Sequence, residues 1–363
     1  MHGQLSMRMR CLRPSGRRRC PLLGGDTAAF CASLVEGMAH LESTLEVDNG
    51  VGGGAGVGSG SVSMRWCADA MRLVKRMQRE MLAIFRKADV PAAAAGGGGW
   101  FEHYMQETAA LLDFLNAFKA AVSRMHRYCI VVDFAAQVGR AAGGDGGGAA
   151  AAASLVVESA AATPRTAEEP GQAASSAAAA VRDKIADAKA AVAEAERLER
   201  TIISAGAGGD AGGMVIVTLV AKITTSVLSM FVLQALTSPS SLDAGGVQPA
   251  LASSAVDVPE LEPWRESLSL IHDRFPSRAT VAEHEKVATV VRDLVNGKDD
   301  GGGRHGSHQQ DELARGHVEL LRARSGELRE EVEMFDCVLD EVFDEVIRGR
   351  NEMLGILRDK ALT

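Results

Sequence analysis

The chain has 363 residues, with 39 Lys and Arg against 47 Asp and Glu, and its formal net charge of −8 at pH 7 excludes a generally basic nucleic-acid binder. Aromatic residues make up only 4% of the chain, which argues against β-sandwiches and barrels. Six scattered cysteines without a CxxC pair fit a reduced, intracellular compartment.

The first 25 residues form a basic tail with six arginines and no acidic residue. Three interpretations fit this composition: a basic disordered tail, which we favour, an organelle transit peptide such as a plastid one, or a nuclear signal. A long apolar stretch is missing from these residues, so secretion is not expected.

Two helices are predicted in residues 26–88. The first covers residues 26–45 with Asp26 as its N-cap, and a Gly-rich linker at 49–60 follows it, without the spacing of a phosphate-binding loop. The second helix covers residues 63–88, begins with a Ser cap and carries one apolar stripe. Opposite this stripe lies a basic face, which consists of Arg72, Lys75, Arg76, Arg79 and Arg86. We expect this face either to contact an anionic membrane surface or to pair with acidic residues of the last helix.

Apolar residues at alternating steps of three and four predict a long helix from Trp100 to about residue 141. Residues 142–180 are rich in Ala, Gly and Ser and are expected to be a disordered insert. A further helix is predicted at 181–203.

Residues 214–236 are almost entirely apolar and contain one charge, Lys222. Their length suits a membrane span, but a charge near the middle costs roughly 2.5 to 3.5 kcal/mol there. We therefore favour a buried central helix over a single-pass anchor. A linker at 238–260, short helices at 262–274 and 279–296, and a polar loop at 297–308 are predicted next.

The most regular pattern begins at Val318 and keeps apolar residues at steps of three and four as far as Ile356, which predicts one very long helix. Its residues 330–345, here called the acidic segment, contain eight acids and no Lys or Arg. The acids avoid the apolar seam, so we expect a solvated or partner-binding face, with Asp336, Asp340 and Asp344 as candidates.

Catalytic and metal-binding motifs are not recognisable in the sequence. The acidic segment contains no Glu-x-x-His motif, and His305, His308 and His317 lie in or beside the predicted loop without ligands at suitable spacing. A nucleophile elbow is also missing. An enzyme is therefore not favoured, a cofactor and a metal are not predicted, and the sequence identifies no small-molecule ligand.

Several segments resemble the plant BYPASS-related family. These are SMRW at 63–66, WFEHY at 100–104 leading to LLDFLNAF at 111–118, and EVFDEVIRGR at 341–350, together with the apolar run before Ser238. The resemblance implies a non-enzymatic helical protein of root and shoot development. The EVFDEVIRGR ending is similar to a branch associated with the exocyst in polarised secretion, which implies an exocyst subunit as protein partner.

The sequence thus predicts an all-α fold: an elongated bundle formed by residues 26–141, 181–237 and 261–363, with a long C-terminal helix. The expected function is a regulator or scaffold that acts through protein contacts near membranes. A single-pass membrane protein anchored by 214–236 is the first alternative, and a small-metabolite enzyme or carrier is the second.

Overall fold

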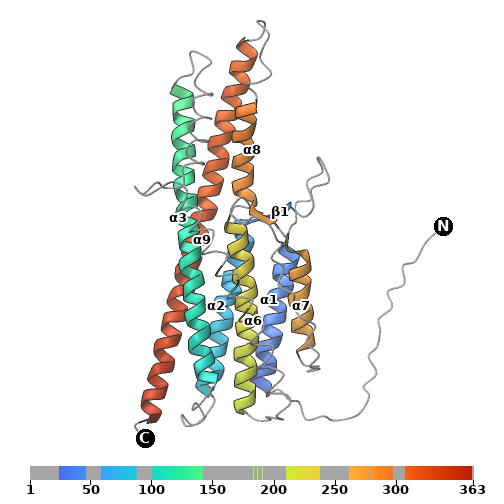
Figure 1. Cartoon of the computed structure of the whole chain (residues 1–363), viewed down its shortest axis with the longest axis vertical. Coiled ribbons are helices and arrows are strands. Elements are labelled where there is room, and N and C mark those ends of the chain that lie inside the picture. Colours follow the sequence, from blue (N-terminus) through green and yellow to red (C-terminus); the bar gives the residue numbers. More distant parts are fainter. Residues whose placement is uncertain are drawn as a thin grey trace, which may run out of the picture.

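The computed structural model describes residues 24–45, 59–87, 100–141, 210–237, 261–276, 278–296 and 307–361, together with Asp183, Ala186 and Ala190. Residues 1–23 of the predicted basic tail, the whole insert at 142–180, the linker at 238–260 and His305 lie outside these residues. Of the predicted helix at 181–203, the three named residues are helical. The described part contains seven helices and one two-stranded sheet, so the all-α prediction is confirmed (Figure 1).

The long helix α9 (Ser307–Ala361) runs along most of the length of the bundle (Figure 1). Its 55 residues correspond to a length of about 80 Å. From Val318 to Met353 the predicted seam positions are buried, which confirms the seam, and Ile356 is half-buried. The helix begins at Ser307, so His308 and His317 belong to it, and the predicted loop assignment of His308 is wrong.

Two further helices pack along α9. These are α2 (Met64–Lys87), which runs parallel to it, and α3 (Trp100–Ala141), which runs antiparallel. The seven core residues expected from the sequence are each at most 1% exposed, which confirms the predicted core. They are Trp66, Leu111, Leu115, Phe118, Val332, Phe335 and Leu339.

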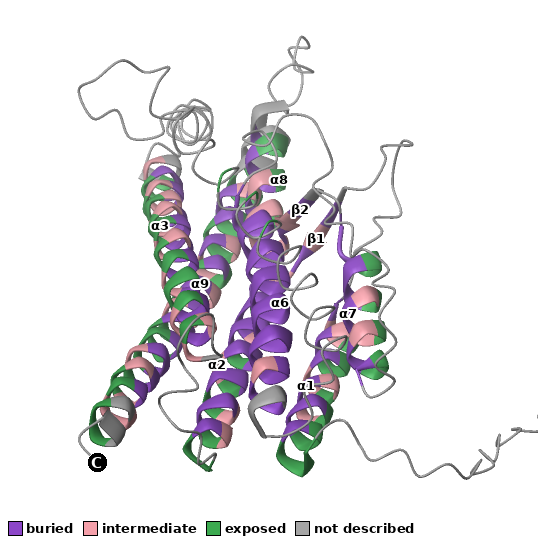
Figure 2. Ribbon diagram, turned by 60° about the horizontal axis from the view of Figure 1, so that its bottom comes forward, coloured by how far each residue is buried: buried purple, intermediate pink, exposed green. Residues whose placement is uncertain are grey.

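Helix α6 (Asp210–Leu236) is buried around nearly its whole circumference (Figure 2). It contacts α2, α3 and α1 (Gly25–Thr44). Its residues 213–236 are long and apolar enough to cross a membrane, but 94% of the most apolar window is buried inside the bundle. Thr218 and Thr224 donate hydrogen bonds to carbonyls one turn earlier, and Thr224 also accepts a hydrogen bond of 3.0 Å from the Trp264 indole. The expected packed central helix is thus present.

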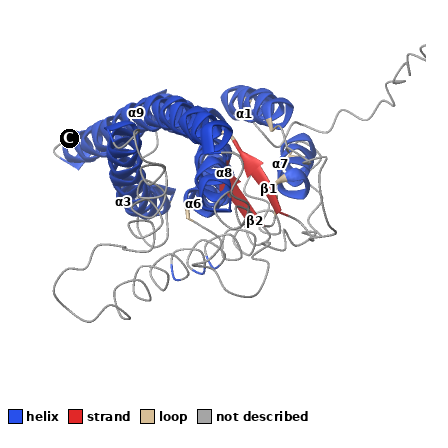
Figure 3. Cartoon of the chain, turned by 90° about the horizontal axis from the view of Figure 1, so that it is seen from above, coloured by secondary structure: helices blue, strands red, loops and turns tan. Residues whose placement is uncertain are grey.

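A short parallel sheet was not predicted. It pairs β1 (Ser59–Val62) with β2 (Arg278–Val281). In Figure 3 the strands lie near α6 and α8 (Ala282–Asn296), with α7 (Glu262–Arg274) on their other side. The linker assignment of residues 59–60 and the helical assignment of residues 279–281 are therefore wrong. Each strand has only four residues and depends on a distant partner, so it leaves little periodic pattern in the local sequence.

The predicted caps have different outcomes. The Ser63 hydroxyl accepts a hydrogen bond of 3.1 Å from the amide of Trp66, as expected of a cap, and Glu283 of α8 accepts one of 3.0 Å from the amide of Met64. The prediction for Asp26 is wrong: Gly24 precedes the first turn of α1, and Asp26 lies inside that turn, where it pairs with Lys87 at 3.1 Å.

The packing of α3 against α9 depends on Gly349. A Cβ atom at this position would lie 2.7 Å from the hydroxyl oxygen of Tyr104, which is 1% exposed. We expect Gly349→Ala to lower the free energy of unfolding by about 1–3 kcal/mol through overpacking. Adding Tyr104→Phe should recover most of this loss, because the next atom, Leu82 Cδ2, is 3.7 Å away.

Urea denaturation of the two single variants and the double variant measures this coupling. Gly326→Ala in the same helix is the control, since nothing lies within 4 Å of its new methyl group. The control should be neutral or stabilising by up to about 1 kcal/mol. Additive effects of Gly349→Ala and Tyr104→Phe would contradict the proposed steric contact.

Candidate functional site

The basic side chains of α2 meet acidic side chains of α9 in a constant register. Each partner lies 266 residues further along the chain. The pairs are Arg65–Glu331 at 3.1 Å, Lys75–Glu341 at 2.9 Å, Arg79–Glu345 at 3.1 Å and Arg86–Glu352. Because the offset is constant, one edge of α2 lies along one edge of α9, and the two helices run parallel. The steps of ten, four and seven residues along α2 keep these side chains on that edge.

This register determines which residues of the predicted basic face pair with α9. Lys75, Arg79 and Arg86 pair with α9, whereas Arg76 donates to the Ser33 carbonyl of α1 at 3.0 Å and Arg72 pairs within α2 with Asp69 at 2.7 Å. The predicted alternative, pairing with the last helix, is therefore present for three of the five residues. The side chains of Arg72, Arg76, Arg79 and Arg86 remain 44–59% exposed, so contact with an anionic surface stays a prediction.

The three predicted partner-face acids divide between two environments. Asp336 and Asp340 each lie 2.7 Å from the Lys119 ammonium of α3, whereas Asp344 is exposed. The pKa of Lys119 is raised, because the hydrogen bonds and charges of the two aspartates outweigh its partial desolvation. Two of the three candidates thus also hold α9 against α3.

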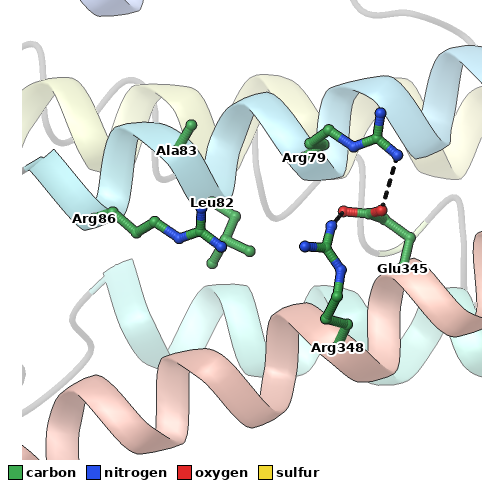
Figure 4. A pocket seen from close by; sticks show the side chains of 6 residues that line it. All are labelled: Arg79, Leu82, Ala83, Arg86, Glu345 and Arg348. Carbon is green, nitrogen blue, oxygen red and sulfur yellow. Dashed lines mark hydrogen bonds and ion pairs between the residues drawn. The ribbon is translucent and has the colours of Figure 1, made fainter.

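A pocket of about 450 Å³ opens between α2 and α9 beside Arg79 and Arg86 of this charged edge (Figure 4). Its lining consists of Arg79, Leu82, Ala83, Arg86, Glu345 and Arg348. Glu345 is only 6% exposed and accepts hydrogen bonds from both Arg79 and Arg348. Arg86 is held by Glu352, whose hydrogen bond raises the pKa of Arg86. Figure 4 shows Arg86 and Arg348 extending toward the same space from opposite helices.

The pocket chemistry favours binding of an anion. Guanidinium groups have five donors in a planar fork that matches phosphate and carboxylate oxygens. Arg79 and Arg86 belong to the predicted basic face. Arg348 was missed, because it follows the acidic segment and its pairing with Glu345 is visible only in the structure.

Metal-ligating clusters do not occur among the described residues. Of the cysteines there, Cys31, Cys67 and Cys129 are buried and Cys337 is exposed. Burial raises the pKa of the Cys31 and Cys129 thiols to about 11. These two thiols therefore stay protonated near neutral pH, which makes them weak nucleophiles and weak metal ligands.

A buried carboxylate in the core was not predicted either. Glu107 of α3 is 2% exposed, and desolvation raises its pKa to about 7, although the Thr225 hydroxyl and the positive charge of Lys222 partly counteract this. Thr225 and Lys222 both belong to α6. Lys222, the charge that argues against a membrane span, therefore has the acidic neighbour Glu107 inside the bundle. Because Glu107 lies deep in the packed core, a structural role that depends on pH suits it.

Comparison of the chain with known protein families, with curated proteins and with solved structures finds no match in any of the three. The resemblance to the BYPASS-related family therefore stays a prediction from the sequence.

Proposed function

We propose that this protein is a non-enzymatic scaffold or regulator that acts through protein contacts at or near membranes. The observation that supports the proposal best is the acidic segment of α9, which is central in the helix and keeps Glu330, Glu333, Asp340 and Asp344 exposed. Phe343 is 40% exposed within the same segment. An exposed acidic surface with an aromatic side chain in it suits a basic protein partner.

The resemblance adds a biological context to this proposal. It suggests root and shoot development or polarised secretion, with an exocyst subunit as the partner to test first. The alternative of a single-pass anchor rests on the length and apolar character of α6. Extraction with alkaline carbonate separates the two: a scaffold is released to the supernatant, whereas an anchored protein stays in the pellet.

The partner surface is tested by the triple variant Asp336→Asn, Asp340→Asn and Asp344→Asn. We expect it to fold, with a loss of about 1 kcal/mol from the Lys119 pairs, because exposed ion pairs contribute little. Binding of the exocyst subunit should weaken strongly in a pull-down, and wild-type binding should fall as salt is raised. Circular dichroism checks the fold.

A matched control removes the same charge from the same helix outside the acidic segment. Glu312→Gln, Glu319→Gln and Asp359→Asn change three exposed residues of α9 and should leave binding intact. Equal loss of binding in both triple variants would indicate a general charge effect. A triple Asn variant that binds as the wild type does, without salt dependence, would contradict the proposed surface.

A further inference from the structure

We propose that the pocket between α2 and α9 is a binding site for a phosphomonoester group, with Arg86 and Arg348 as its main donors. The proposal goes beyond the scaffold function, which concerns the acidic segment and a protein partner. Either can fail without the other, because the proposed phosphate donors Arg86 and Arg348 lie outside the acidic segment, and none of the aspartates changed to test the partner surface lines the pocket.

The charge of the lining matches such a group. Three guanidinium groups and one carboxylate line the pocket, and Glu352 pairs with Arg86, so together these side chains keep an excess of one positive charge. A phosphomonoester carries about −1.5 to −2 at pH 7 and offers three strong acceptor oxygens. Glu352 pairs with Arg86 but is not among the lining residues, so a bound phosphate would share Arg86 with it.

The arginines are held in place before any ligand arrives. Glu345 is almost fully buried and binds Arg79 and Arg348 together, and Glu352 accepts hydrogen bonds from both Nε and Nη2 of Arg86. Each guanidinium has five donors, so these pairs leave donors for a ligand. Long side chains that are already ordered lose less entropy on binding, which favours affinity.

The shape of the pocket narrows the ligand class. Its volume of about 450 Å³ exceeds that of a phosphate ion and lies within the range of small-molecule sites. Leu82 and Ala83 supply an apolar part of the lining, which suits the ring carbons of a phosphorylated sugar or inositol (Figure 4). Such a group can come from a soluble metabolite or from a lipid headgroup.

Binding is tested on the full chain with two probes. Soluble inositol trisphosphate is titrated calorimetrically, and phosphatidylcholine vesicles with and without phosphatidylinositol bisphosphate are sedimented with the protein. The double variant Arg86→Gln and Arg348→Gln should weaken binding at least about tenfold, because it removes two charge-assisted donors. Arg348→Lys keeps the charge but not the planar fork and should give an intermediate loss.

Arg358→Gln is the control, since Arg358 is exposed on the same helix and does not line the pocket. Binding of both probes that depends on the pocket arginines supports a phosphate site open to either source. Binding of vesicles alone assigns it to a lipid headgroup, and binding of the soluble probe alone to a metabolite. Absence of binding to both, or equal losses in Arg358→Gln and the double variant, would overturn the proposal, whatever the result for the acidic segment.

Discussion

Replacement of Leu339 by Asp is expected to lower the free energy of unfolding by several kcal/mol, on the order of 4. Leu339 is fully buried in the middle of the α9 seam, and its neighbours Phe335 and Val342 are equally buried. A carboxylate there would lose its hydration. Because a domain is stable by only about 5–15 kcal/mol in total, this single change should leave much of the protein unfolded at moderate urea concentrations.

Two comparison variants separate the causes of this loss. Leu339→Ala removes the packing without adding a charge and should cost about 2–5 kcal/mol. Leu354→Asp places the same charge on the same helix at a position that is 49% exposed, and should cost little. Urea denaturation followed by circular dichroism measures all three. Equal midpoints for Leu339→Asp and Leu354→Asp would show that the seam does not hold the fold together.

Stability should fall between about pH 5 and pH 8 because of Glu107. Burial raises the pKa of Glu107 from 4.5 in the unfolded chain to about 7 in the folded one. The folded state therefore binds the proton more tightly. This contribution is fully present below the unfolded pKa and is lost as the pH rises through the folded pKa. A shift of this size corresponds to roughly 3 kcal/mol.

Glu107→Gln keeps the shape of the side chain and removes its titration. The free energy of unfolding of this variant should vary with pH less than that of the wild type between about pH 5 and pH 8. Glu102→Gln, an exposed position on the same helix, is the matched control and should keep the wild-type slope. If Glu107→Gln keeps that slope too, the pH dependence has another origin.

Long periodic elements could be predicted from the sequence, because an apolar step of three and four residues repeats many times in them. This holds for α9, for α3 and for the basic helix α2. The strands could not be predicted, since each has four residues and pairs with a segment more than 200 residues away. Their stability comes from tertiary packing, which a local pattern does not contain.

Only part of the candidate pocket could be predicted from the sequence. Spacing placed Arg79 and Arg86 on one face of a helix, but the register that brings Arg348 to them is set by packing between helices far apart in the chain. Glu107 was missed for a similar reason. It lies beside the buried Thr108, and only the approach of α6 turns that side of α3 into core.

The offset of 266 residues between α2 and its partners on α9 also bears on how the protein is made. At about 5–20 residues per second, a ribosome needs roughly 13 to 50 s to synthesise the chain between them. During that interval the apolar stripe and the arginines of α2 have no α9 to pack against. Newly made N-terminal helices would thus be exposed to aggregation, and we expect their capture by a chaperone until α9 emerges.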